Sequence, residues 1–162
     1  MKGFKAAIEN SAIENTNFRK VLYTSEYCQL VLMSLLPKEE IGVETHQAND
    51  QFFRVEKGHG RCIIDDSEYE LLDGDAFVVP RGARHNVINL SATEALQLYT
   101  IYSPPHHKDG MVRATKMDAE TNGQEFDGIT TERRPDANGL QPGNERPSGD
   151  LDQADQGELP PV

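Results

Sequence analysis

The sequence predicts an all-β protein, a sandwich or small barrel, followed by an acidic tail. Between residues 18 and 103, short runs rich in β-branched and aromatic residues alternate with turn-forming residues, a pattern typical of strands joined by hairpins. The chain contains no long amphipathic pattern and no run near the roughly 18 apolar residues of a membrane span. Its 162 residues suffice for one domain with a sizeable core.

Nine strands are predicted in chain order, after a first segment, residues 1–17, that fits either a short helix or an edge strand. Turn signals such as Asp73-Gly74 and Pro80-Arg81-Gly82 separate them. The strand over residues 29–36 is apolar on both faces, so we expect it to be covered on both sides, in the barrel centre or in a dimer contact. The predicted strands cover residues 18–24, 29–36, 41–46, 51–56, 61–65, 68–72, 76–79, 85–90 and 95–102.

Most of the negative charge lies near the end of the chain. Residues 118–162 hold eleven acidic and three basic side chains, a net charge of −8, which leaves −3 of the total of −11 for residues 1–117. With six glycines, five prolines and few large apolar residues, this tail is predicted to be disordered, either as a solubilising extension or as an acidic interaction segment. The charge distribution argues against nucleic acid or an anionic membrane as a partner.

The cysteine pattern and the first residues predict a cytoplasmic protein. Cys28 and Cys62 fit no metal or redox spacing, and residues 1–10 lack the apolar run of a secretory signal. We therefore expect a reducing compartment.

Two potential metal ligands share one face of the predicted strand over residues 41–46. Alternate side chains of a strand point the same way, so Glu44 and His46 lie on one face while Thr45 points away. A carboxylate oxygen and an imidazole nitrogen are thereby offered together.

A second stretch carries a spaced set of glycines, a proline and a histidine. Gly74, Pro80, Gly82, His85 and Asn89 follow the pattern G-x5-P-x-G-x2-H-x3-N. This resembles the second motif of the cupin superfamily at every defining position. The resemblance implies a single antiparallel jelly-roll β-barrel over residues 1–117, with the disordered acidic tail in residues 118–162.

The first motif of that family is present in altered form. The family pattern is a glycine, a His-x-His pair, a glutamate four or five residues later and a closing glycine. Here Glu44 and His46 fill the pair, Gln51 stands in the glutamate position and Gly58 follows after six intervening residues, whereas Gly42 lies closer to the pair than the pattern prescribes. The resemblance thus implies that Glu44, His46, Gln51 and His85 hold a metal ion.

The chemistry of these four side chains remains compatible with a metal. Two imidazoles and one carboxylate bind borderline divalent ions, and the Gln51 carbonyl is a weaker neutral donor. Mn, Fe, Co, Ni and Zn all suit the set. Asp50 is a rival to Gln51, although counting back from Gly58 favours Gln51. The alternative is an empty or water-filled barrel whose polar residues bond one another.

Strand alternation predicts which side chains surround the metal. If Gln51 faces inward, Phe53 and Val55 do too, and Val87 shares the face of His85. These three apolar residues are the predicted contacts for a small-molecule ligand. The remaining histidines, His59 and the pair at 106–107, are expected in exposed loops, with a position of the pair over the barrel mouth as the alternative.

Three function classes fit this site. The preferred one is a metal-dependent isomerase or epimerase acting on a sugar or sugar phosphate, because some single-domain cupins carry a mannose-6-phosphate isomerase label, a loose resemblance. A non-haem iron dioxygenase is the second, since Glu44, His46 and His85 match a 2-His-1-carboxylate set. The third is a metabolite-binding cupin without turnover. A homodimer is expected from the family and from the two-sided apolar strand.

Overall fold

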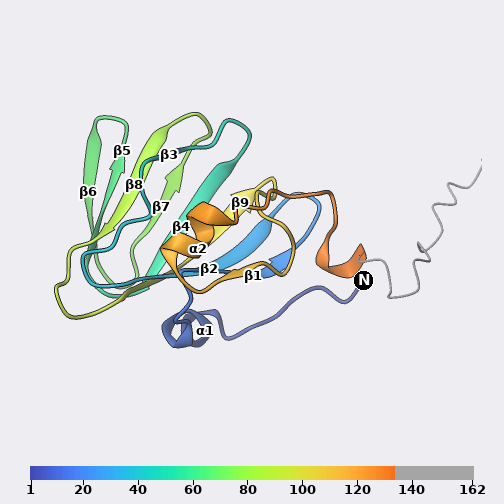
Figure 1. Cartoon of the computed structure of the whole chain (residues 1–162), viewed down its shortest axis with the longest axis horizontal. Coiled ribbons are helices and arrows are strands. Elements are labelled where there is room, and N and C mark those ends of the chain that lie inside the picture. Colours follow the sequence, from blue (N-terminus) through green and yellow to red (C-terminus); the bar gives the residue numbers. More distant parts are fainter. Residues whose placement is uncertain (134–162) are drawn as a thin grey trace, which may run out of the picture.

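The computed structural model describes residues 1–133 and confirms the all-β prediction, with ten strands in that part of the chain (Figure 1). The strands form two antiparallel sheets, ordered β10-β1-β2-β9-β4-β7 and β3-β8-β5-β6. The elements are α1 (Ile8–Glu14), β1 (Arg19–Thr24), β2 (Gln29–Leu35), β3 (Glu44–Thr45), β4 (Asp50–Lys57), β5 (Gly60–Ile64), β6 (Ser67–Leu71), β7 (Ala76–Val79), β8 (Arg84–Asn89), β9 (Leu96–Ser103), β10 (Val112–Arg113), α2 (Lys116–Thr121) and η1 (Thr131–Arg133).

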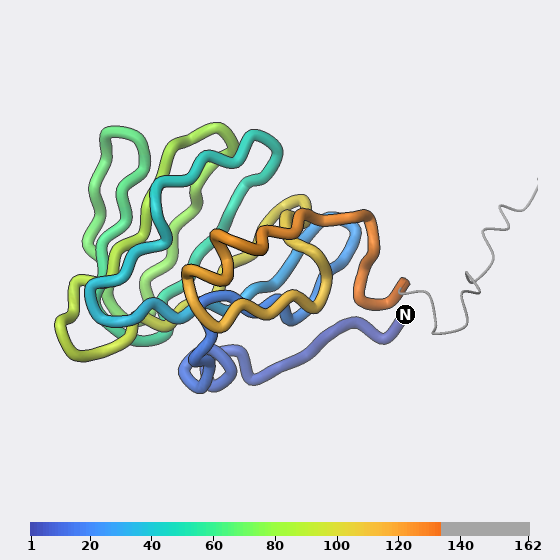
Figure 2. The backbone as a smooth tube through the Cα atoms, viewed as in Figure 1, coloured from blue at the N-terminus to red at the C-terminus, as the bar shows by residue number. Residues whose placement is uncertain are grey.

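The two sheets enclose one hydrophobic core, the arrangement of a jelly-roll barrel (Figure 2). Strand β4 shows why the sequence folds this way, because its burial alternates residue by residue, with Gln51, Phe53 and Val55 inward. The core side chains come from both sheets and include Val31, Met33, Leu35, Phe53, Val55, Cys62, Val87, Leu96 and Leu98.

Strand β2 is covered on both faces within one chain. It lies in the larger sheet between β1 and β9, and Val31, Met33 and Leu35 point into the core. On the other face, Leu32 is also buried, and α1 packs against β2, β4 and β9. Of the two expectations for residues 29–36, the barrel-centre position is therefore the one observed. The first segment forms a helix rather than an edge strand.

The third predicted strand is shorter than expected. Instead of residues 41–46, only Glu44–Thr45 pair as β3. Gly42 has a φ of 95°, outside the extended region, and its N–H donates to the side-chain Oδ1 of Asn86 at 3.1 Å instead of to a strand backbone. This left-handed residue breaks the strand just before the two potential ligands.

The folded chain continues past the boundary predicted at residue 117. That position lies inside α2, which begins with a capping box in which the Thr115 hydroxyl accepts from the backbone N–H of Asp118 and the Asp118 carboxylate accepts from that of Thr115. Further along, the Thr131 hydroxyl accepts from the backbone N–H of Thr24 at 2.8 Å. Residues 118–133 thus pack on the barrel, and the rest of the predicted tail, residues 134–162, lies outside the described residues. No helix in the described part is long and apolar enough to cross a membrane.

Candidate metal centre

Neighbouring strands of the smaller sheet bring three potential ligands together. Glu44 of β3 lies directly opposite His85 of β8 in the antiparallel register, and His46 follows β3 on the same face as Glu44. The carbonyl of His46 accepts from the backbone N–H of Gly82 at 2.8 Å, which ties this residue to the turn before β8. One ligand atom from each of Glu44, His46 and His85 lies within 4.8 Å of the others.

The unpaired nitrogens of the two histidines fit a metal ion. His85 is buried, and its Nδ1 lies 3.3 Å from the carbonyl of Ala83. If Nδ1 carries the proton, Nε2 presents a lone pair, as metal-ligating histidines do. The Nε2 atoms of His46 and His85 are both buried without a hydrogen-bond partner. Buried polar atoms rarely lack a hydrogen-bond partner unless an ion or a water molecule binds them.

The charge state of this cluster also suits a cation. Burial acts to raise the pKa of Glu44, but its contact with His46 and the positive charge of Arg19 outweigh burial and hold that pKa below its usual value. Burial is the main factor that lowers the pKa of His85. The site therefore combines an ionised carboxylate with an imidazole held neutral, the protonation state that metal binding requires.

The spacing of the ligand atoms is close to that of a coordination shell. Ligands about 2.1 Å from an ion, at tetrahedral or octahedral angles, lie about 3.0–3.4 Å apart. His46 Nε2 and Glu44 Oε2 are 3.3 Å apart. Two lone pairs at this distance repel each other unless a proton or a cation lies between them. The ligand atoms of the whole trio lie within 4.8 Å of one another, so the side chains would have to move closer together to hold one ion.

Gln51 faces the barrel interior and Asp50 does not. Gln51 is buried, its Nε2 donates to the Thr100 hydroxyl at 3.0 Å, and its Oε1 has no hydrogen-bond partner. Asp50 is exposed, and its Oδ1 accepts from the backbone N–H of Arg81 at 2.9 Å. A turn contact on the surface thus occupies the rival carboxylate, whereas the Gln51 carbonyl oxygen is free to act as a ligand.

Two buried residues that the sequence did not point to lie against the trio. Arg19 of β1 places Nη2 3.6 Å from Glu44 Oε1. The Tyr102 ring of β9 lies edge-on to the His46 ring, with 5.6 Å between centroids. Tyr102 is also opposite Gln51 in the pairing of β4 with β9, and burial raises the pKa of its hydroxyl so that it stays neutral. Both come from the larger sheet, across the barrel from β3 and β8.

The pair His106 and His107 corrects the expectation of an exposed loop. His106 is half-buried and its ring lies 4.4 Å from that of His46, while His107 is buried. The fully buried amide of Gln29 fixes the segment, accepting from the backbone N–H of His107 at 2.9 Å and donating to its carbonyl at 2.6 Å. The pair therefore lies over the barrel mouth. By contrast, His59 is exposed and contacts Glu70 at 2.9 Å, as predicted.

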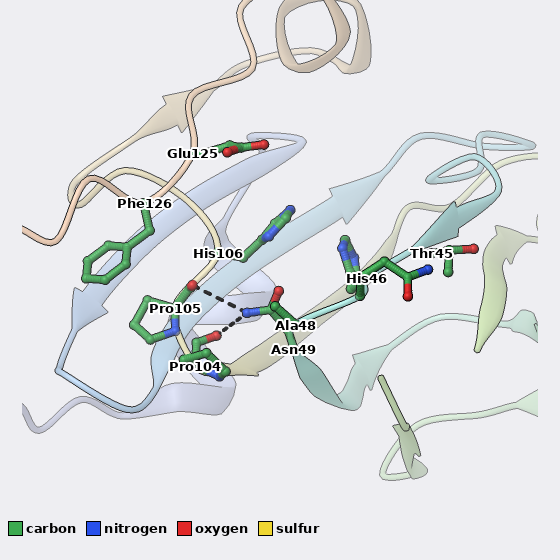
Figure 3. A pocket seen from close by; sticks show the side chains of 10 residues that line it. Thr45, His46, Ala48, Asn49, Pro104, Pro105, His106, Glu125 and Phe126 are labelled. Carbon is green, nitrogen blue, oxygen red and sulfur yellow. Dashed lines mark hydrogen bonds between the residues drawn. The ribbon is translucent and has the colours of Figure 1, made fainter. Parts of the chain in front are cut away.

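A pocket of about 310 Å³ opens beside His46 (Figure 3). His46 and His106 stand next to each other on its wall, and Glu125 and Phe126 approach from the segment after α2. The backbone N–H of Phe126 donates to the carbonyl of His106 at 2.9 Å, which holds that segment against the pocket. The lining residues are Thr45, His46, Gln47, Ala48, Asn49, Pro104, Pro105, His106, Glu125 and Phe126.

The apolar residues predicted to contact a ligand do not line this pocket. Phe53, Val55 and Val87 are all fully buried in the core. Their inward direction agrees with the alternation of their strands, and the Phe53 ring lies 6.2 Å from that of His85. Phe53 thus supports His85 from the core, and Val55 and Val87 belong to the core itself.

This chain is similar in sequence and in structure to known proteins. A family model described as a cupin domain matches residues 31–102. Protein L612 of Acanthamoeba polyphaga mimivirus is 43% identical over 108 residues, 65% of this chain and 68% of that protein. YrkC of Bacillus subtilis strain 168 is 43% identical over 124 residues, 73% of this chain and 66% of that protein. The crystal structure of BH2720 from Bacillus halodurans matches with a TM-score of 0.72 at 37% identity, covering 74% of this chain and 95% of that one.

Proposed function

This chain belongs to the cupin superfamily, and from that premise we propose that it is a metal-dependent cupin acting on a small polar metabolite. The observation that carries the proposal is the trio Glu44, His46 and His85, in which the buried Nε2 of His85 has no hydrogen-bond partner and that of His46 faces the ionised Glu44 carboxylate at 3.3 Å. A packed core without a ligand rarely retains such a group of polar atoms.

The proposed metal ligands are Glu44, His46 and His85, with the Gln51 carbonyl oxygen as a weaker fourth. Mn, Fe, Co, Ni and Zn all accept this mixture of nitrogen and oxygen donors. A bound divalent ion would supply a Lewis acid that polarises a carbonyl or hydroxyl of the metabolite. The pocket beside His46, at about 310 Å³, is at the small end of ligand sites and fits a compact metabolite.

For the reaction, we propose an isomerase or epimerase acting on a sugar or sugar phosphate. Such a reaction needs a side chain that accepts a proton from the substrate. His106 supports this class, because it lines the pocket next to His46 and burial lowers its pKa to about 4. A histidine with that pKa is neutral near pH 7 and can accept a proton, although the low pKa makes it a weak base.

A second candidate is a non-haem iron dioxygenase. It is favoured by the trio itself, since two histidines and one carboxylate leave open positions on an iron ion for substrate and dioxygen. The Gln51 amide bonds to Thr100, which is consistent with a three-residue shell in which Gln51 stays outside.

Metal analysis of the wild-type protein and of His85→Ala tests the proposal. We expect about one transition-metal ion per wild-type chain and a loss of that ion in His85→Ala, because two ligands cannot hold it as tightly as three. His59→Ala is the matched control, since His59 is exposed and remote from the trio. Equal metal content in all three proteins would refute the metal centre. If the metal centre is present, oxygen uptake by the iron-loaded protein would favour the dioxygenase. Metal-dependent ligand binding without any product would instead indicate a binding protein without turnover.

The homodimer and the cytoplasmic location stay predictions from the sequence and the family. Because both faces of β2 are covered within one chain, a dimer would need another surface. Light scattering of the purified full chain would measure the oligomeric state.

A further inference from the structure

We propose that Arg19 forms an anion-binding subsite beside the metal centre, so that the small molecule bound there carries a carboxylate. This inference rests on the proposed metal-dependent function and narrows its ligand class. It concerns a residue that neither cupin motif contains, because Arg19 lies on β1, ahead of both.

Arg19 is an arginine without a full set of partners in a buried position. It is only 8% exposed. Among residues 1–133 its one ion pair is the 3.6 Å contact of Nη2 with Glu44 Oε1, longer than a good hydrogen bond. Its Nε is buried without any partner. Arginine is seldom buried unless its donors are used, so this guanidinium has donors left for a ligand.

The charge balance of the site changes when a cation binds. Without a metal, Glu44 is the carboxylate that faces Arg19. A divalent ion at the trio would draw the same carboxylate into its shell and leave two cationic centres against one anion. The loaded site therefore has an excess of positive charge, which an anionic ligand would neutralise.

Other charged groups near this position do not remove that excess. Arg113 pairs with Arg19 in the register of β1 and β10 and adds positive charge, although its own guanidinium donates to the carbonyl of Asn122. The acidic residue at the pocket, Glu125, is exposed to solvent. Its charge is screened by water, whereas the guanidinium of Arg19 is not.

A second unpaired group lies beside the site. His107 Nε2 is buried without a hydrogen-bond partner, and the ring of the preceding His106 lies 4.4 Å from that of His46. The His107 ring also meets the Tyr102 ring edge-on at 5.0 Å. A planar carboxylate can accept from two donors of one guanidinium, which a single hydroxyl cannot do equally well. The unused donors of Arg19 thus favour a carboxylate over a neutral hydroxyl.

The test uses the full chain loaded with Co(II), whose visible absorption reports ligands that enter the coordination shell. Glycolate is the anionic probe, and its neutral amide, glycolamide, is the matched uncharged one. We expect wild-type protein to bind glycolate at least about tenfold more tightly than glycolamide. Arg19→Gln should lose about 10- to 100-fold in glycolate affinity, the range of charge-assisted hydrogen bonds, with little change for glycolamide.

The control variant is Arg54→Gln, which removes one positive charge from the outer face of β4, where Arg54 pairs with Glu56 at 3.2 Å. It should keep the wild-type preference for glycolate. Co(II) affinity is measured for each variant, because the proposal predicts that Arg19→Gln binds Co(II) as well as or better than wild type, since a repelling charge has been removed. If Arg19 serves only to hold Glu44 in place, Co(II) affinity should fall and the preference for glycolate should remain. That pattern would overturn the inference.

Two further outcomes separate this inference from the function on which it rests. Wild-type protein that binds Co(II) but prefers neither probe overturns the anion subsite and leaves the metal centre intact. Wild-type protein that takes up no Co(II) refutes the metal centre, and the subsite with it. Should Arg19→Gln fail to fold, Arg19→Lys replaces it, because lysine keeps the charge but not the paired donors. It should retain a preference for glycolate at reduced affinity, and an unchanged glycolate affinity would contradict the role of the guanidinium.

Discussion

Replacing Gln29 with leucine should destabilise the barrel, because this one amide holds the segment over its mouth. Gln29 is fully buried. Its Oε1 accepts from the backbone N–H of His107 at 2.9 Å and of His106 at 3.3 Å, and its Nε2 donates to the carbonyl of His107 at 2.6 Å and to the Thr24 hydroxyl at 2.9 Å. Leucine has a similar volume and no polar atoms, so these bonds are lost without creating a large cavity.

The magnitude follows from the number of bonds. Each buried hydrogen bond contributes about 0.5–1.5 kcal/mol net, and an abandoned buried partner costs about 1–3 kcal/mol. Some of the abandoned groups will reach water when the segment shifts, so we expect Gln29→Leu to lower the free energy of unfolding by about 3 kcal/mol. With a urea dependence of about 1–3 kcal/mol/M, the midpoint should fall by roughly 1–3 M.

Equilibrium urea unfolding, followed by circular dichroism, measures this shift. The matched control is Gln47→Leu, because Gln47 is exposed and surface substitutions usually change stability by about 0.5 kcal/mol or less. A midpoint for Gln29→Leu that coincides with the control would refute the reasoning. In that case the amide would not be what holds His106 and His107 in place.

Three other perturbations test separate parts of the structure. Gln51→Glu should strengthen metal binding at least about tenfold, or about 1.4 kcal/mol, because a carboxylate replaces a neutral donor. Competition with a chelator measures this affinity, and an unchanged value would place residue 51 outside the coordination shell. Gly60→Ala puts a Cβ 2.9 Å from a backbone oxygen of β8 and should lower the free energy of unfolding by about 1–3 kcal/mol, whereas Gly123→Ala, with its nearest atom at 3.9 Å, should not. Burial raises the pKa of the Cys62 thiol to about 12, so below pH 9 a thiol reagent should modify only the exposed Cys28 in the folded chain; two fast-reacting thiols would contradict the burial.

The sequence by itself determined the features that depend on short-range rules. Strand alternation placed Glu44 and His46 on one face and turned Gln51, Phe53 and Val55 inward, because side chains of a strand repeat every two residues whatever surrounds it. The turn residues ahead of His85 similarly fixed where its strand begins. These rules also predicted the all-β architecture, whereas the family was indicated by the resemblance of the motif from Gly74 to Asn89.

Only the tertiary structure decided which distant residues complete the site. Arg19 from β1 and the pair His106 and His107 after β9 reach the trio because the larger sheet folds over β3 and β8, and no local pattern encodes that approach. Packing likewise decided which residues line the pocket and which lie in the core. Phe53 belongs to the core, where it supports the trio. Which groups meet at the barrel mouth depends on strand order and sheet packing, and these follow from burying the whole core at once.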